Sequence, residues 1–256
     1  MSTSVMTERL REASPRFKAR IAGVLYLIIF VTAAFAEIFV RGRLVVRGDA
    51  AATATNILAH ESLYRLGGVA DLINLACDTA LALLFYELLK PVSRSFSLLA
   101  AFFRLMHVAI MAVITLNHFA PLVLLRGAHA AAFTEDQLQA LALVSLRLHA
   151  QGYNICLVFF GFSCLLLGYL IFRSTFLPRI VGVWMGLGGL AYVTNSFARF
   201  LSPQLATYLS SYILVFAGLG ELSLMLWLLV VGVNVQRWNE QASSAAIADH
   251  STQSLT

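Results

Sequence analysis

The chain has 256 residues, of which 59% are hydrophobic and only 12% are charged, and its formal net charge is +5. Soluble domains carry about 25% charged residues, so no soluble core would bury this much apolar sequence. The composition therefore excludes an ordinary soluble protein and predicts an all-α, polytopic membrane helical bundle. The positive charge lies in loops and chain ends. Basic residues at these positions indicate how the protein is oriented in the membrane, and no nucleic-acid partner is expected.

The first part of the chain is expected to form a tail, one span and a short helix at the membrane surface. Residues 1–18 make a polar tail, and no signal-peptide cleavage site follows them. The first span is expected at residues 21–40, where Arg41 and the arginines after it end the apolar run. Asp49 then follows a turn and can cap a short amphipathic helix that lies on the membrane surface.

Five further apolar segments complete a set of six predicted transmembrane helices. They cover residues 63–89, 95–125, 135–172, 180–200 and 208–235. Thr134 and Gln137 are expected to form a capping box at the start of the segment 135–172. This segment is longer than is needed to cross a bilayer, so it should protrude, tilt or break near Gly152. Residues 19–236 are thus expected to form a single transmembrane domain. The Ser-, Ala- and Gln-rich residues 237–256 are expected to be a disordered tail.

The fifth predicted span contains small residues that favour close helix packing. Gly182 and Gly186 have the spacing of a G-x-x-x-G motif, and Gly189 lies close by. Small residues let transmembrane helices approach one another closely. This span is therefore expected to pack tightly against a neighbouring helix.

The basic residues at the ends of the spans predict an orientation. More lysines and arginines fall on the side of the two termini than on the other side, although the arginines after the first span oppose this difference. Cytoplasmic loops carry an excess of Lys and Arg. We therefore expect a multi-pass protein of the cell (inner) membrane with both termini in the cytoplasm.

The second predicted span carries three polar residues near its middle. Asp71, Asn74 and Asp78 share one face of a helix, because about seven residues return a helix almost to the same bearing. A central Asp costs roughly 2.5–3.5 kcal/mol on the insertion scale. This acidic face is therefore expected to point into the bundle and to meet donors from other helices there.

The depth of polar residues, counted from basic residues at the cytoplasmic side, predicts which of them meet. Asp78 and Arg104 lie at nearly equal depth and are expected to form an ion pair, with His107 one turn further. Asp71 belongs to a second layer nearer the outside, together with Glu37, Asn154, Asn195 and Glu221. The candidate ligand-binding residues are Asp71, Asn74, Asp78, Arg104, His107, Asn195 and Glu221.

Three functions remain open for this polar set. Ionisable groups inside a membrane more often mark a ligand pocket, an ion path or a proton relay than a packing device. The leading hypothesis is therefore small-molecule or ion binding or transport. One alternative is a membrane-embedded enzyme that uses Asp71, Asp78 or Glu221 as an acid or base on a lipid-soluble substrate. The other is a structural or regulatory subunit. No catalytic residue is assigned, and a non-enzymatic role is favoured.

No metal site or cofactor is predicted. His118 and His149 lie at similar depth, but the helical bearing of His149 turns it away from the polar face of its own helix, so the two cannot easily face one centre. The three cysteines form no C-x-x-C pair, and no Gly-rich phosphate loop occurs. The expected partners are membrane lipids and a small-molecule or ion ligand. The sequence predicts no oligomeric state.

Several stretches of the sequence are similar to one known family. They include ARIAGVLYL at 19–27, GDAAATATNILAHESLYRLG at 48–67 and LPRIVGVWMGLGGLAYVTNSF at 177–197. These stretches resemble the DUF4386 family of uncharacterised bacterial multi-pass membrane proteins, over roughly residues 17–235. The resemblance implies a bacterial integral membrane protein, and it implies no activity, substrate or catalytic residue.

Overall fold

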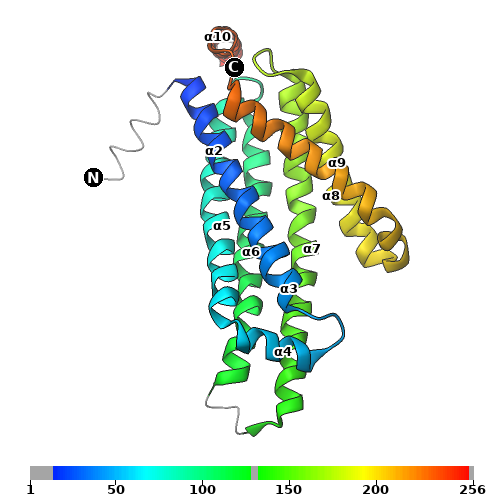
Figure 1. Cartoon of the computed structure of the whole chain (residues 1–256). Helices are drawn as coiled ribbons and strands as arrows, with labels where there is room; N and C mark the ends of the chain where they lie inside the picture. The colour runs from blue at the N-terminus through cyan, green and yellow to red at the C-terminus, as the bar shows by residue number, and fades with distance from the viewer. Residues whose placement is uncertain (1–13, 128–131, 254–256) are drawn as a thin grey trace, which may run out of the picture. The chain divides into compact units, whose positions relative to one another are not determined.

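The computed structural model describes residues 14–127 and 132–253 (Figure 1). Every regular element in these two ranges is helical. The helices are α2 (Pro15–Ala34), the π-helix η1 (Phe35–Arg41), α3 (Gly42–Leu44), α4 (Ala50–Ala59), α5 (Glu61–Leu89), α6 (Arg94–Arg126), α7 (Glu135–Arg173), α8 (Arg179–Leu201), α9 (Pro203–Val230) and α10 (Val235–Gln253). The predicted all-α class is confirmed. Most of the predicted N-terminal tail, residues 1–13, lies outside the described residues.

The helices have the length and apolarity of a polytopic membrane protein. Five helical stretches in the described residues can cross a membrane: Pro15–Leu44, α5, α6, α7 and α8. A sixth is present if Val215–Val230 and Val235–Ile247, which are bent by 106° at a short break, count as one span. Large apolar side chains such as Val113 and Leu116 are exposed on these helices, as expected for surfaces that face lipid. The predicted membrane helical bundle is thus confirmed.

The contacts divide the chain into two compact units, which we describe separately. The first unit contains Met1–Leu27, Thr79–Leu105 and Val158–Thr256, and the second unit contains Ile28–Asp78 and Met106–Leu157. Helices α2, α5, α6 and α7 each contribute residues to both units.

The second unit is built from the π-helical segment, α4 and parts of α5, α6 and α7. Buried apolar residues of these elements form its core: Val40, Leu44, Ile57, Tyr64, Leu122 and Leu146. A Cβ atom on Gly152 of α7 would lie 2.3 Å from Cγ2 of Ile114 in α6. Helix α7 continues through Gly152 without a break, which leaves protrusion or tilt of the three expected alternatives, and this glycine serves close packing against α6.

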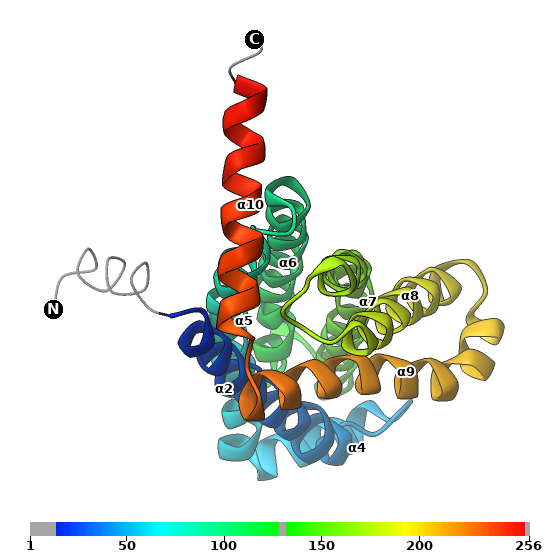
Figure 2. The same cartoon turned by 90° about the horizontal axis from the view of Figure 1, so that it is seen from above.

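In the first unit, glycines bring α8 into close contact with α7. A Cβ atom on Gly182 would lie 2.6 Å from the backbone nitrogen of Phe172, and one on Gly189 would lie 2.6 Å from that of Leu165. A Cβ atom on Gly186 would meet nothing within 4 Å. The predicted close packing of this span is confirmed. Helix α9 lies beside α8 on another side (Figure 2).

The predicted helix caps are also present. Asp49 is the N-cap of α4, and its Oδ1 accepts a hydrogen bond of 2.8 Å from the backbone nitrogen of Ala52. At the start of α7, Thr134 Oγ1 accepts from the Gln137 backbone nitrogen at 3.3 Å, and Gln137 Oε1 accepts from the Thr134 backbone nitrogen at 3.0 Å. Both caps satisfy backbone donors that a helix start leaves open.

The first span does not end where the sequence analysis places its end. The helical path continues past Val40 through the π-helix η1 and α3 to Leu44. Arg41, which was expected to stop the span, is buried within it. It can stay there because two carboxylates bind its guanidinium, as described below.

The C-terminal residues differ from the sequence prediction as well. Residues 237–253 were expected to be disordered, but they form most of α10. Its Trp238 Nε1 donates a hydrogen bond of 2.8 Å to the carbonyl of Leu88, and its Gln241 Oε1 accepts one of 3.0 Å from the backbone nitrogen of Thr175. The composition of this segment favours disorder, but these contacts with the rest of the first unit stabilise a helix.

Candidate functional site

The polar residues predicted as a site are mostly buried, and the structure assigns them to both units. Asp71 and Asp78 of α5 are 4% and 2% exposed, so neither carboxylate faces the lipid side of the helix. Asp71, Asn74, Asp78 and His107 belong to the second unit, and Arg104, Asn195 and Glu221 belong to the first. The predicted ion pair between Asp78 and Arg104 joins residues of different units and stays a prediction.

The strongest polar contact in the second unit joins Asp71 to Arg41. Arg41 Nη1 lies 2.6 Å from Asp71 Oδ2, and Arg41 Nη2 lies 3.1 Å from Asp71 Oδ1. The side chains are only 9% and 5% exposed. Two parallel N–H···O bonds between ionised groups make a bidentate pair, which fixes geometry as well as charge. The donor expected opposite Asp71 is thus an arginine of the first span.

Arg41 also binds a second carboxylate and a histidine. Its Nη2 lies 2.8 Å from Glu37 Oε1, one helical turn earlier, and its Nη1 lies 3.5 Å from His118 Nδ1. Glu37 and Arg41 both lie in the π-helix η1. Single-turn π-helical segments inside α-helices occur frequently at functional sites.

Tyr64 and His118 stack on each other beside this ion pair, and each side chain hydrogen-bonds the backbone carbonyl of the other. Their rings stack with centroids 4.3 Å apart, the Tyr64 hydroxyl donates to the His118 carbonyl, and His118 Nε2 lies 3.1 Å from the Tyr64 carbonyl. A carbonyl can only accept, so His118 Nε2 carries the hydrogen and Nδ1 presents its lone pair to Arg41. This pattern describes a neutral imidazole that serves Arg41 as a third acceptor.

His149 of α7 completes the group. Its ring centroid lies 6.0 Å from that of His118, and its Nδ1 lies 3.0 Å from the Ile114 carbonyl, to which it donates. In the neutral imidazole its Nε2 then carries a lone pair, and this buried atom has no hydrogen-bond partner among the described residues. The two rings thus lie near each other, while the expectation that they cannot easily face one centre stays a prediction. We call Glu37, Arg41, Tyr64, Asp71, His118 and His149 the Arg41 cluster.

Asn74 and Asp78, on the same helix as Asp71, make other contacts in the second unit. Asn74 Nδ2 donates to the Ile29 carbonyl at 3.0 Å and lies 3.3 Å from Thr32 Oγ1, so it ties α5 to α2. Asp78 Oδ2 lies 4.0 Å from His107 Nε2. His107 Nδ1 donates to the Cys156 carbonyl at 3.2 Å, which leaves Nε2 directed at the carboxylate. Asp78 and His107 thus lie close to each other within the second unit.

A second buried charged group forms in the first unit around Glu221. The hydroxyl of Tyr26 donates to Glu221 Oε2 at 3.0 Å, and the hydroxyl of Tyr192 donates to Glu221 Oε1. Helices α2 and α8 thus each supply one hydroxyl to a carboxylate on α9. Hydrogen bonds to an ionised acceptor are roughly twice as strong as neutral ones.

Arg104 of α6 lies among aromatic rings of the same unit. Its guanidinium carbon is 5.5 Å from the ring centroid of Tyr26, 5.4 Å from that of Phe85 and 5.1 Å from that of Phe160. Arg104 is 1% exposed. Tyr26 therefore connects the two predicted residues, because its ring faces Arg104 and its hydroxyl binds Glu221. We call Tyr26, Phe85, Arg104, Phe160, Tyr192 and Glu221 the Arg104 cluster.

Asn195, the remaining predicted residue, is buried in α8. Its Oδ1 and the hydroxyl of the adjacent Ser196 have no hydrogen-bond partner among the described residues. Within the described residues, the Asn195 side-chain oxygen thus takes part in no hydrogen bond of the candidate site. Among the described residues, no three His, Cys, Asp or Glu side chains gather as they would to hold a metal ion.

The residues that contact the predicted ones were not predicted from the sequence. Arg41 was taken as the end of the first span, although its i,i+4 spacing from Glu37 is a detectable signal of an ion pair within a helix. Tyr26, Tyr64 and Tyr192 were not among the candidate residues, and nothing in the local sequence of Tyr26 or Tyr64 indicates a hydroxyl that binds a buried group.

The comparisons with known proteins give a family and no activity. A family described as a domain of unknown function, DUF4386, matches residues 21–232. An uncharacterized protein from Archaeoglobus fulgidus is 25% identical to this chain over 171 residues, which cover 67% of this chain and 85% of that protein. No solved structure matches. The bacterial source that the resemblance implies stays an expectation.

Proposed function

Because this chain belongs to the DUF4386 family, whose function is unknown, we propose a function from its own residues: it binds a small molecule or an ion inside the membrane and transports it. The Arg41 cluster is the proposed binding centre. The observation that carries this proposal is the buried bidentate pair of Arg41 and Asp71, with Glu37 and His118 on the same guanidinium.

The position of this pair makes a purely architectural role unfavourable. Asp71 lies ten residues after Glu61, the first residue of α5 (71 − 61), which corresponds to about 15 Å along the helix. Ionisable side chains at such depth are costly and mark ligand or ion pathways by default. Well-packed apolar residues of similar volume often replace a buried ion pair without loss of stability. The presence of these charges therefore supports a role other than packing.

The chemistry of the cluster indicates which ligands it favours. Two carboxylates surround one guanidinium, so with neutral imidazoles the cluster carries a net negative charge. The buried Nε2 of His149 offers a lone pair that no described residue satisfies. An unsatisfied buried acceptor is costly, and a bound donor relieves that cost. The cluster thus favours a cation or a solute that carries hydrogen-bond donors.

We further propose that the protein lies in the cell (inner) membrane with both termini in the cytoplasm. Basic residues at the helix ends of the first unit, such as Arg20, Lys90 and Arg173, support this orientation. A green fluorescent protein fused to the C-terminus should then fluoresce, and alkaline phosphatase fused there should be inactive. The opposite pair of results would reverse the orientation.

The transport proposal is tested by the solute content of cells that lack the protein or overproduce it. Overproduction should change the level of at least one cationic or donor-rich solute. Asp71→Asn should abolish the change, because the substitution removes the charge that Arg41 binds while keeping the shape of the side chain. Glu61→Gln is the matched control, since Glu61 pairs with Arg65 and Arg126 at the end of the span and lies outside the cluster.

The outcomes of this experiment separate the three functions. Identical solute profiles in cells with and without the protein would count against transport. A change confined to lipid species would favour the enzyme. Unchanged solutes and lipids, with a partner that co-purifies in fixed ratio, would favour the structural subunit. Each variant must also be present in the membrane at the wild-type level, which excludes loss by misfolding.

A further inference from the structure

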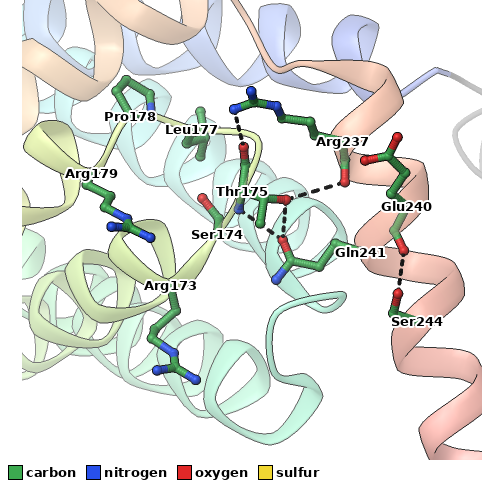
Figure 3. Close-up of a pocket in the computed structure, with 10 residues that line it drawn as sticks. All are labelled: Arg173, Ser174, Thr175, Leu177, Pro178, Arg179, Arg237, Glu240, Gln241 and Ser244. Atoms are coloured by element: carbon green, nitrogen blue, oxygen red, sulfur yellow. Dashed lines mark hydrogen bonds between the residues drawn. The ribbon is translucent and has the colours of Figure 1, made fainter.

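The first unit contains a pocket that shares no residue with either cluster. Its volume is about 720 Å³, and it lies between the end of α7, the start of α8 and α10 (Figure 3). Figure 3 shows Arg173 and Arg179 on one side of this pocket and the α10 residues Arg237, Glu240 and Gln241 on the other. The pocket thus lies where α7 ends and α8 begins, and both helices are long and apolar enough to cross a membrane.

The pocket is positively charged. Three of its lining residues are arginines, Arg173, Arg179 and Arg237, and one is an acid, Glu240. The Arg237 guanidinium donates to the Thr175 carbonyl at 3.3 Å, and that of Arg179 lies 5.8 Å from the ring centroid of Phe172. None of the three arginines forms a salt bridge with a carboxylate in residues 14–127 or 132–253. Their charge is therefore available to an anion.

Hydrogen bonds hold the two sides of the pocket together. Gln241 Oε1 accepts from both the backbone nitrogen and the hydroxyl of Thr175, each at 3.0 Å. The Thr175 hydroxyl also lies 3.5 Å from the Arg237 carbonyl. These bonds join α10 to the segment between α7 and α8 (Figure 3). These hydrogen bonds fix the backbone segments that carry the arginines. Less entropy is therefore lost when an anion binds.

We propose that this pocket binds a phosphate group, which comes either from an anionic phospholipid headgroup or from a soluble phosphate. Arginine is suited to this ligand, because its planar guanidinium donates two parallel hydrogen bonds to phosphate oxygens. Basic pockets at the cytoplasmic ends of transmembrane helices bind anionic headgroups through the same chemistry. The site is independent of the transport proposal, since it shares no residue with the Arg41 cluster.

The test measures binding to the purified full-length protein in non-ionic detergent. The ligands are short-chain phosphatidic acid, short-chain phosphatidylcholine and inorganic phosphate. The rise in melting temperature is measured as a function of ligand concentration, and the concentration that gives half of the maximal rise is compared. The test variant is Arg173→Gln with Arg179→Gln. The control is Arg43→Gln with Arg47→Gln, which removes the same charge from exposed residues of the second unit.

Each arginine near a membrane surface contributes about a five-fold change in affinity for an anionic lipid. The test variant should therefore bind phosphatidic acid roughly 25-fold more weakly than the wild type, and the control variant should be unchanged. Preference for phosphatidic acid over phosphatidylcholine identifies a headgroup as the source. Stabilisation by inorganic phosphate with the same loss in the test variant identifies a soluble phosphate. Equal affinities in the two double variants, or no stabilisation of the wild type by any of the anions, would overturn the proposal.

Discussion

Two buried arginines are accommodated in different ways in the two units. Arg41 of the second unit is bound by two carboxylates and an imidazole nitrogen, in contacts of 2.6–3.5 Å. Arg104 of the first unit is surrounded by three aromatic rings whose centroids lie 5.1–5.5 Å away. In the same unit, the carboxylate of Glu221 accepts hydrogen bonds from two tyrosine hydroxyls.

This difference in surroundings fits the proposal that the Arg41 cluster binds a ligand and that the Arg104 cluster serves packing. Aromatic rings attract a guanidinium by about 0.5–2 kcal/mol each, and they add a large apolar contact surface. The Arg104 cluster therefore combines charge with dense packing. The Arg41 cluster instead gathers exchangeable polar contacts around a net negative charge and leaves His149 Nε2 open. A ligand can compete for those contacts, whereas it cannot readily displace packed rings.

The largest effect is expected when Arg41 loses its main partner. Asp71→Leu should lower the free energy of unfolding by about 3–5 kcal/mol, because it leaves a buried charge without its bidentate carboxylate. Adding Arg41→Met should recover most of that loss, since no lone charge then remains. Unfolding in mixed detergent and dodecyl sulfate measures both values. Losses that simply add in the double variant would show that the two residues do not act as a pair.

A smaller effect is expected for the hydroxyls that bind Glu221. Tyr26→Phe and Tyr192→Phe should each cost about 1.5–3 kcal/mol, the range for a hydrogen bond to a charged group. Tyr26→Phe keeps the ring that faces Arg104, so it isolates the hydroxyl from the aromatic contact. The same unfolding measurement applies. A cost below about 0.5 kcal/mol in both variants would mean that Glu221 is stabilised by other groups.

The smallest effect is expected for a single ring of the Arg104 cluster. Phe160→Leu keeps an apolar side chain but removes the π face, so the coupling lost with Arg104 should be about 0.5–2 kcal/mol. A double-mutant cycle with Arg104→Met isolates that coupling from the packing change. A coupling energy of zero would show that the rings serve Arg104 only as apolar surface.

The sequence predicts the spans better than it predicts the contacts between them. Span length, the cap at Asp49 and the capping box at Thr134 are local patterns, and each is present in the structure. The burial of Asp71 also follows from local sequence, because a lipid-facing carboxylate is too costly. Its partner, Arg41, lies 30 residues away and looks like the charged end of a helix when it is examined alone.

The C-terminal helix and the contact between His149 and His118 could not be predicted from the sequence for the same physical reason. The segment after residue 236 has a composition typical of disorder, and its helix α10 depends on partners such as Leu88 that are remote in sequence. The approach of His149 to His118 likewise depends on the placement of two helices. Helical periodicity gives the bearing of each side chain on its own helix, and it contains no information on where the other helix lies.

The central claim is that the Arg41 cluster binds a transported ligand and is not a packing device. The most direct test compares the solute content of cells that produce the wild type, cells that produce Arg41→Met with Asp71→Leu, and cells that lack the protein. The double variant should reach wild-type levels in the membrane with near wild-type stability, yet give the solute profile of cells without the protein. A double variant that keeps the wild-type solute profile would contradict the claim.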